Sequence, residues 1–560
     1  MKESTVQDAC NILVDVLVAK GVKNVVLSPG SRSAPLVVAI SRCDMLRKYV
    51  VVDERAAAFM ALGMARESKS PVAIVCTSGS ALLNYAPALA EAYYSEIPLI
   101  AISADRSEEW IDQDDGQAIH QYDMLSHIVK DSFDIPTRYD DNDGLWYVNR
   151  MINEACLLVN KAPLGPVHIN FHFADNLYGV KSVEPNSSRQ IDWMSERNLS
   201  DETFSKLGRI YNESEKVMIV GGFVQSTSLL QDSLIQLSED SRTVVFVETI
   251  ANVSGGKIIR TIDRTISAIE DYQIEKFSPD LLITFGGPTI TRMMKQMIRK
   301  YQPKHHWHIG VKHNIIDISR NLTMAVDIAP DRFFAKMVEM KNWSKSPYAA
   351  EWAIVNNKAL DNHNQYIRQS PWCDLRAFDI LSKKISLESD LHFSNGTPVR
   401  YAQLYGDIFS QKNTCNRGVS GIDGCSSTAL GAALVSGKDT ILITGDMSFS
   451  YDTGGLFSQY KPNHFKIIVI QNGGGGIFRF IKGPDTLSEL EPYFEVKRNL
   501  DLAKYADAMG YDYFSAADEK SLECVLSEFL DNKAASILAV TTNGEVNAKI
   551  LRDYFRNLKN

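Results

Sequence analysis

The 560-residue chain lacks several features that would assign it to a simple class of protein. It has eight cysteines but no CxxC pair, which argues against a zinc site or a disulfide framework. No apolar run approaches the roughly 20 residues that span a bilayer. The first ten residues, MKESTVQDAC, lack the basic-then-apolar pattern of a signal peptide. We therefore expect a cytoplasmic protein with reduced cysteines and no membrane span.

The chain also lacks an excess of positive charge. Its formal net charge is −9 and its pI is about 5.7, which argues against a nucleic-acid partner. An acidic protein that binds acidic small molecules must gather positive charge locally, so single arginines in loops are of interest.

Short apolar runs alternate with helix-like segments along most of the sequence. This alternation predicts an α/β fold in which three domains each contain a mostly parallel sheet covered by helices. The expected domains are residues 1–180, 200–342 and 373–560, separated by polar linkers at 181–200 and 342–372. The expected strands lie within residues 22–30, 71–80, 98–106, 165–171, 216–222, 242–249, 280–288, 306–310, 324–329, 390–396, 439–446, 466–473 and 536–542.

Two neighbouring strands of the third domain end in polar residues. One ends at Gly445-Asp446, with Ser448 just beyond, and the next ends at Asn472 before four consecutive glycines. Ligands bind beyond the carboxyl ends of parallel strands, so Asp446, Asn472 and the Gly474 carbonyl are candidate oxygen ligands for Mg²⁺. The plainer alternatives are a helix-capping aspartate and a flexible glycine loop.

The third domain contains Gly-Asp followed, after about 25 residues, by Asn. This pattern resembles the signature of enzymes that use thiamin diphosphate (ThDP), whose usual form is GDG…NN. Met447 and Gln471 depart from that form without removing a metal ligand. These enzymes also need a carboxylate that hydrogen-bonds N1′ of the cofactor's aminopyrimidine ring. Glu54, which follows a strand and begins a predicted helix, matches it. Taken alone, Glu54 could equally be an acidic residue that favours a helix start.

Further stretches resemble one ThDP-dependent family, the 2-succinyl-5-enolpyruvyl-6-hydroxy-3-cyclohexene-1-carboxylate (SEPHCHC) synthases of menaquinone biosynthesis. The most specific matches are SPGSRSAPL at 28–36 and NRGVSGIDGCSSTALG at 416–431. Others are DERAAAFMALG (53–63), TSGSALLNYAPALAEAYYSEIPLI (77–100), ADR (104–106), GQAIHQ (116–121), GPVHINFHFADNLY (165–178), GDMSFSYD (445–452) and GGGGIF (473–478). The matches cover the first and third domains, while the middle domain matches weakly.

The resemblance implies a reaction and a set of substrates. The family decarboxylates 2-oxoglutarate and adds the resulting succinyl carbanion to isochorismate in a Stetter-like 1,4-addition. ThDP and Mg²⁺ are the implied cofactors, with Mn²⁺ as an alternative metal. Because both substrates are dicarboxylates, the site should contain several arginines. An acetolactate-synthase-like carboligase or decarboxylase needs fewer cationic anchors, and a non-catalytic nucleotide-binding module needs none of the catalytic residues.

The resemblance also implies a role for each matched residue. Glu54, Ile422, Gly445, Ser448, Asn472 and Ile477 would contact ThDP, with Glu54 catalytic. Arg400 and Arg417 would hold the carboxylate derived from 2-oxoglutarate, whereas Ser31, Arg32, Arg106, Gln117 and Arg292 would hold isochorismate. Phe478 and Ile477 would line the site, and a bulky Ile422 would support the bent cofactor. Plain core packing for Ile422 and a surface position for Arg292 are the alternatives.

Two departures from the family affect substrate contacts. Thr291 stands where relatives often have a lysine, and Gly396 stands where they often have a serine. The resemblance further implies a homodimer or a dimer of dimers with active sites at the subunit interface.

Overall fold

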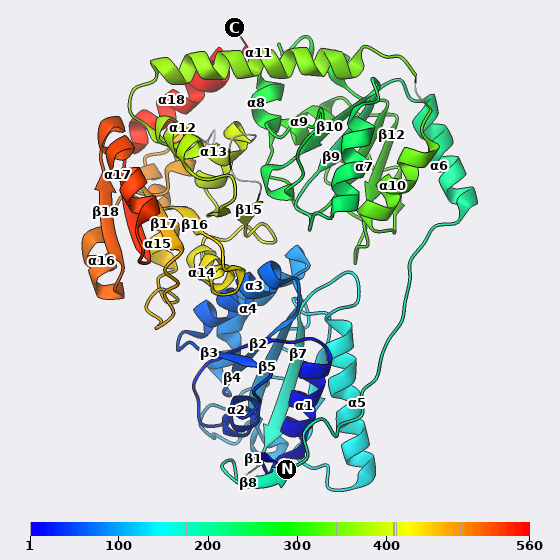
Figure 1. Cartoon of the computed structure of the whole chain (residues 1–560), viewed down its shortest axis with the longest axis vertical. Coiled ribbons are helices and arrows are strands. Elements are labelled where there is room, and N and C mark those ends of the chain that lie inside the picture. Colours follow the sequence, from blue (N-terminus) through cyan, green and yellow to red (C-terminus); the bar gives the residue numbers. More distant parts are fainter. Residues whose placement is uncertain are drawn as a thin grey trace. The chain divides into compact units, whose positions relative to one another are not determined.

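The computed structural model describes residues 2–174, 176–342, 344–406, 409, 412–480 and 483–559. Three sheets of parallel strands carry helices on their faces, which confirms the predicted α/β fold class (Figure 1). The chain forms two compact units. The first comprises Met1–Ser195, Gly418–Thr440 and Ser448–Phe465, and the second comprises Glu196–Arg417, Ile441–Met447 and Lys466–Asn560. Each sheet falls within one predicted domain, and the domain boundaries themselves stay a prediction.

The first sheet has six parallel strands in the order β3-β2-β4-β5-β7-β6. Its strands are β2 (Asn24–Leu27), β3 (Arg47–Val50), β4 (Val72–Cys76), β5 (Leu99–Arg106), β6 (Ser132–Ile135) and β7 (Val167–Phe173). Helices α1 (Asp8–Ala19), α2 (Ala34–Ser41) and α5 (Asn142–Leu158) share one hydrophobic core with these strands. Helices α3 (Glu54–Ser68) and α4 (Ser80–Ser95) also contact the sheet, and the turn η1 (Glu108–Trp110) follows β5.

The second sheet has five parallel strands in the order β10-β9-β11-β12-β13. They are β9 (Val217–Gly221), β10 (Thr243–Val247), β11 (Leu281–Phe285), β12 (His305–Ile309) and β13 (Met324–Val326). One hydrophobic core contains α6 (Asp201–Glu213), α7 (Ser228–Ser238) and α10 (Pro330–Met340). A second contains α8 (Ile262–Ser267), η3 (Ile274–Phe277), α9 (Met293–Lys300) and α11 (Tyr348–Gln369). Turn η2 (Thr249–Ala251) follows β10.

The third sheet has six strands in the order β15-β14-β16-β17-β19-β18. They are β14 (Asp390–Phe393), β15 (Lys412–Cys415), β16 (Thr440–Gly445), β17 (Phe465–Gln471), β18 (Asp512–Ala516) and β19 (Ser536–Thr541). Helices α12 (Asp374–Lys384), α13 (Pro398–Tyr405), α17 (Glu519–Asp531) and α18 (Gly544–Asn557) share a core with it. The remaining elements are α14 (Cys425–Ser436), α15 (Asp446–Tyr451), η4 (Gly476–Arg479), η5 (Pro484–Thr486), η6 (Leu490–Glu495) and α16 (Leu502–Met509).

Every expected strand is present, and the strands that the sequence did not reveal lie at sheet edges. β3 and β6 flank the first sheet, and β15 and β18 flank the third. An edge strand is covered less completely and does not need a continuous apolar run. The mostly exposed β18 illustrates this, whereas β15, with the sequence KNTC, is largely buried but lacks an apolar run.

The expected linker at 342–372 is wrong, because most of it forms the 22-residue helix α11. Its buried residues include Tyr348, Trp352, Ala359, His363 and Ile367, at spacings that place them along one face. The exposed faces carry the polar residues that made the segment resemble a linker. Helix α11 therefore contributes to two cores of the second unit.

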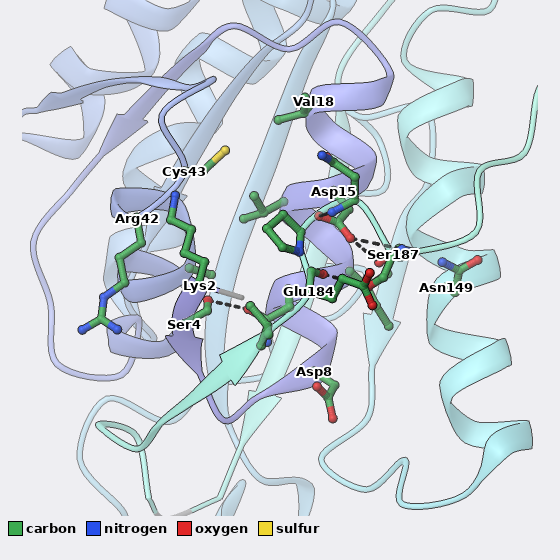
Figure 2. A pocket seen from close by; sticks show the side chains of 18 of the residues that line it. Lys2, Ser4, Asp8, Asp15, Val18, Arg42, Cys43, Asn149, Glu184 and Ser187 are labelled. Carbon is green, nitrogen blue, oxygen red and sulfur yellow. Dashed lines mark hydrogen bonds between the residues drawn. The ribbon is translucent and has the colours of Figure 1, made fainter.

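The other expected linker begins with a short strand, β8 (Val180–Val183), which pairs antiparallel with β1 (Lys2–Thr5). Beyond it, the Asp15 carboxylate on α1 accepts hydrogen bonds from the Asn186 and Ser188 amides. Figure 2 shows the pocket of about 960 Å³ lined by this segment, α1, α2 and α5. Its lysines are paired with carboxylates, Lys181 with Asp8 and Lys2 with Asp44. None of the predicted site residues lines this pocket.

Glycines bring helices α3 and α14 into close contact within the first unit. A Cβ atom added to Gly63 on α3 would overlap the carbonyl oxygen of Thr428, and one added to Gly431 on α14 would overlap that of Met60. The helices approach backbone to backbone at these two points, so even one methyl group would force them apart. This packing holds α3, which carries Glu54, against α14.

Replacing Gly431 by alanine should lower the melting temperature of the protein, because overpacking a tight contact typically costs about 1–3 kcal/mol. Gly208 on α6 provides a matched helical control, since its added methyl group would meet only the flexible end of Met340. Gly208→Ala should leave the melting temperature unchanged or raise it, because alanine favours helices. Scanning calorimetry of both variants tests the contact; equal shifts in the two would contradict it.

Candidate active site

Asp446 lies where β16 ends and is the first residue of α15. Only 3% of it is exposed. Its Oδ2 accepts a hydrogen bond from the Gly473 amide at 2.9 Å, and its Oδ1 accepts one from the Met447 amide at 2.8 Å. Burial raises the pKa of this carboxyl to about 6 despite these bonds. The bond to Gly473 joins the ends of two strands, so Asp446 is more than a helix-capping residue. Next to it, the Gly445 amide faces the Ser394 hydroxyl at 3.3 Å.

The four glycines after β17 form a defined loop. Gly473 and Gly474 adopt φ angles of +93° and +150°, which side chains disfavour. A Cβ atom on Gly474 would lie 2.6 Å from the Glu495 carbonyl oxygen. That oxygen accepts a hydrogen bond from the Gly475 amide at 2.8 Å. The glycines therefore serve backbone geometry and close packing at the end of β17.

Asn472 is oriented by a carboxylate that the sequence did not single out. Its Nδ2 donates to Oδ2 of Asp374, the first residue of α12, at 3.0 Å. Asp374 is fully buried and also accepts a hydrogen bond from the Thr542 hydroxyl at 2.5 Å. Holding the amide nitrogen in this way directs the Asn472 oxygen elsewhere. The neighbouring Gln471 side chain donates to the Leu500 carbonyl, so this unusual residue bonds away from Asp374.

The carboxyl ends of β17 and β19 border a pocket of about 520 Å³ that includes Asn472 and Gly473. No group of three or more His, Cys, Asp or Glu residues in the described ranges is arranged to hold a metal ion. The buried Asp446 carboxylate, the oriented Asn472 amide oxygen and glycine carbonyls are hard oxygen donors near this edge, while the second buried carboxylate, Asp374, is engaged by Asn472 and Thr542. Such a set suits Mg²⁺ better than zinc.

Glu54 begins helix α3, directly after Asp53, whose carboxylate caps the helix by accepting from the Ala56 amide. The Glu54 side chain is half-buried. Burial first, and then the negative charge of Glu54, raise the pKa of the Cys76 thiol at the end of β4. The carboxylate therefore lies near the carboxyl edge of the first sheet, as its predicted role requires.

Ile422 lies in the loop before α14, and its carbonyl accepts a hydrogen bond from the Ser448 hydroxyl at 3.0 Å. The structure thus brings these two predicted cofactor residues together. A buried Glu91 on α4 fixes the same loop by accepting bonds from the Gly418 and Val419 amides, both at 2.8 Å. Glu91 could have been noticed in the sequence, because it is the one acidic residue within the largely apolar helix α4.

Four predicted substrate residues lie at loops of the first sheet. Ser31 and Arg32 follow β2, and Arg32 donates to the Phe173 carbonyl at the end of β7. Arg106 ends β5, and its guanidinium bonds to the Gly116 carbonyl and pairs with Asp115 at 3.0 Å. Gln117 has a φ angle of +59° and lies directly beside Gly79 after β4. Arg106 thereby holds the loop that carries Gln117.

The other three predicted arginines lie in the second unit, where two of them act on the third. Burial, followed by the positive charges of Arg417 and Arg292, lowers the pKa of Arg400. Arg417 is only 9% exposed and donates to Asn395 at 2.8 Å, while its buried Nε has no hydrogen-bond partner among the residues that the structure describes. The Arg292 side chain is exposed, which fits the alternative of a surface position, but its positive charge still acts on Arg400.

Buried acids fix the loops around this cationic cluster. Glu248 is fully buried and accepts bonds from the Ile290 and Thr291 amides at 2.8 and 2.9 Å. Burial raises the pKa of Glu248 to about 7, and the Arg417 charge opposes that rise. Thr291, an uncharged residue where relatives often have a lysine, donates its hydroxyl to Asp263. The other departure, Gly396, has a φ angle of +96°, where a serine would be strained.

Ile477 and Phe478 lie in turn η4, and the Phe478 ring contacts Phe494 with centroids 5.6 Å apart. Both side chains are half-buried.

Within the described ranges, no helix has the length and apolar character needed to cross a membrane.

Comparisons with known proteins agree with the residue matches. Residues 7–124 match the family model "Thiamine pyrophosphate enzyme, N-terminal TPP binding domain", and residues 395–540 match the corresponding C-terminal TPP binding domain. The chain is 39% identical to the SEPHCHC synthase of Porphyromonas gingivalis W83, covering 97% of this chain and 96% of the relative. It is 38% identical to that of Flavobacterium psychrophilum, over 98% of both chains. The synthase of Christiangramia forsetii is 37% identical over the full length of both.

Identity of this extent over almost the whole length, together with both thiamine pyrophosphate-binding regions, shows that the chain belongs to the SEPHCHC synthases, a family of ThDP-dependent transferases of menaquinone biosynthesis.

Proposed function

We propose that the protein decarboxylates 2-oxoglutarate and transfers the remaining four-carbon unit to isochorismate by 1,4-addition. The observation that carries this proposal is the coupled cluster of Arg292, Arg400 and Arg417 in the second unit, with Arg32 and Arg106 at strand ends of the first. Two dicarboxylate substrates present three carboxylates after CO₂ is lost. Several arginines, each able to bind a carboxylate bidentately, meet this need. A pyruvate-type substrate would require fewer of them.

The proposed cofactor residues come from the family resemblance, and their positions at the ends of strands support them. Asp446, the Asn472 amide oxygen and the Gly474 carbonyl would hold Mg²⁺, which in turn would bind the diphosphate. Gly445, Ser448, Ile422 and Ile477 would contact ThDP. Bound ThDP supplies a carbon nucleophile and an electron sink for decarboxylation. Glu54 would hold a proton against N1′ of its aminopyrimidine.

The arginines divide between the two substrates. Arg400 and Arg417 would bind the side-chain carboxylate that comes from 2-oxoglutarate. The Nε of Arg417, which has no partner within the described ranges, supports this role. Ser31, Arg32, Arg106, Gln117 and Arg292 would bind isochorismate. Ile477 and Phe478 would form an apolar wall that favours loss of CO₂ by excluding water.

We also propose that the enzyme works as a homodimer or a dimer of dimers. The family resemblance supports this assembly, in which the pyrimidine-binding domain of one subunit faces the diphosphate-binding domain of the other. Each active site would then require two chains.

Replacing Glu54 by glutamine should lower kcat by about 10²–10⁴-fold, the usual range for a lost acid–base group. The amide keeps the shape of the side chain but cannot act as a carboxylate at N1′. ThDP binding, followed by fluorescence titration in the presence of Mg²⁺, should change little because the diphosphate anchors are intact. Full turnover by Glu54→Gln would remove this residue from the mechanism.

Replacing Asp374 by asparagine should weaken the apparent affinity for Mg²⁺ by about 10–100-fold, as loss of an outer-shell partner typically does. The new side chain loses the negative charge and one of its two acceptor oxygens, so it holds the Asn472 amide less firmly. Titration of ThDP binding with Mg²⁺ measures the effect. Asp379→Asn is the control, because Asp379 lies on the same helix and pairs with Lys383 and Arg376 instead. Equal Mg²⁺ affinities in the two variants would refute the role of Asp374.

Arg417→Ala should raise KM for 2-oxoglutarate roughly 10–100-fold, the effect of losing a charged hydrogen bond. The KM for isochorismate should change much less. Arg32→Ala should show the reverse pattern, since Arg32 lies at the first sheet. Steady-state kinetics with each substrate varied separately would test this division. A change confined to isochorismate kinetics in Arg417→Ala would show that the arginines are assigned to the wrong substrates.

A further inference from the structure

A buried polar network lies beneath the carboxyl ends of β5, β6 and β7 in the first unit. At its centre, the fully buried Asn170 donates to Asp105 and to Asp134, both at 2.9 Å. Its amide oxygen accepts bonds from the Ser103 hydroxyl and from Gln121 at 2.7 and 2.9 Å. Every hydrogen-bonding position of the Asn170 amide is therefore used, and the network joins three neighbouring strands to Gln121.

His172, two residues further along β7, closes this network on one side. Its Nε2 lies 2.9 Å from Oδ1 of Asp134, and its Nδ1 contacts the backbone carbonyl of Arg106. The Asn170 amide nitrogen, a donor, lies farther from Nε2, at 3.3 Å. Asp134 and the Arg106 carbonyl are acceptors, so both ring nitrogens donate when these two shorter contacts are hydrogen bonds. Only the imidazolium form has two donors. The ring is 4% exposed, so water does not replace either partner easily.

The network holds both ends of the segment from Arg106 to Gln121. At its start, the Arg106 carbonyl accepts from His172, and the Arg106 amide donates to Asp105 at 2.8 Å. At its end, the Gln121 side chain donates to the Ala104 carbonyl and accepts from the Gly79 amide at 2.6 Å. Between these points the Arg106 guanidinium bonds to the Gly116 carbonyl, next to Gln117.

We propose that His172 is a positioning residue for the isochorismate subsite, acting as an imidazolium that fixes Arg106 and, through it, the loop that carries Gln117. This role rests on the proposed assignment of Arg106 and Gln117 to isochorismate. His172 itself touches neither substrate; it acts through the backbone of Arg106. Arg32 also bonds to this end of β7, because its guanidinium donates to the carbonyl of Phe173.

The surrounding charges favour the imidazolium. The titratable and charged groups that face His172 are Asp105 and Arg106 on β5, Asp134 on β6, Glu108 on η1 and His168 on β7. The Arg106 guanidinium is engaged by Asp115 and Gly116, and burial lowers the pKa of His168 to about 4, which keeps it neutral. Burial also disfavours a charged His172, but its bonds to Asp134 and the Arg106 carbonyl outweigh this and raise its pKa to about 9.

The direction of the pH dependence follows from this raised pKa. An unperturbed histidine titrates near pH 6.5. The contact is therefore fully present below about pH 6.5 and is lost as the pH rises through about 9. Deprotonation would leave the Nε2 lone pair facing the Asp134 carboxylate. We expect the KM for isochorismate to rise between pH 8 and pH 10. The KM for 2-oxoglutarate should not show the same rise.

Two substitutions at position 172 test the role in the holoenzyme. His172→Leu removes both donors and should raise the KM for isochorismate about tenfold at pH 7.5. His172→Asn keeps one donor near the position of Nδ1 and should restore part of that loss. In both variants kcat and the KM for 2-oxoglutarate should stay within about twofold, and the rise between pH 8 and pH 10 should disappear.

His168→Asn is the matched control, because His168 is equally buried on the same strand but bonds to Ser103 rather than to Arg106. An equal rise in the KM for isochorismate in this variant would mean general loosening and would overturn the proposal. Histidine-selective ¹³C NMR of the unmutated enzyme gives an answer even if the variants fold poorly. A His172 resonance that titrates near pH 6.5 would also overturn the proposal.

Arg106→Ala, measured in parallel, separates this inference from the proposed function. An unchanged KM for isochorismate in Arg106→Ala would refute the assignment of Arg106. The NMR titration would still decide whether His172 is held as an imidazolium.

Discussion

In a parallel sheet all strands end at the same edge, and the residues just beyond that edge have no further strand to pair with. The polar residues that we propose for binding follow this constraint. In the third sheet, Asp446 and Asn472 come directly after β16 and β17. In the first sheet, Arg106 ends β5 and Arg32 follows β2. The proposed binding residues therefore lie at strand ends, while the strand interiors form the cores.

Buried acids then hold the loops at those edges. Asp446 accepts from Gly473, Glu91 from Gly418 and Val419, and Glu248 from Ile290 and Thr291. Each of these carboxylates satisfies backbone amides that no sheet or helix would otherwise satisfy. A carboxylate removed from water is costly unless hydrogen bonds and positive charge surround it. The positive charge of Arg417, which opposes the rise in the pKa of Glu248, therefore contributes to the fold as well as to the proposed binding.

Sequence patterns reveal strands and strand-end residues, but they do not reveal long-range partners. Asp446 and Asn472 follow apolar runs, so their proximity could be predicted from the order of the strands. Asp374 is 98 residues from Asn472, and no local pattern marks it as the partner of that amide. Edge strands such as β18 were missed because their exposed residues break the apolar run. Helix α11 was missed for a different reason, since its buried residues have helical spacing but are few among polar neighbours.

The account depends most on the claim that this chain itself joins 2-oxoglutarate to isochorismate. Mass spectrometry of the purified protein with ThDP, Mg²⁺ and both substrates measures this directly, with CO₂ release followed in the same reaction. We expect one CO₂ for each molecule of adduct, no adduct when either substrate or ThDP is omitted, and little product when pyruvate replaces 2-oxoglutarate. Efficient use of pyruvate, or CO₂ release with no adduct of isochorismate, would contradict the account.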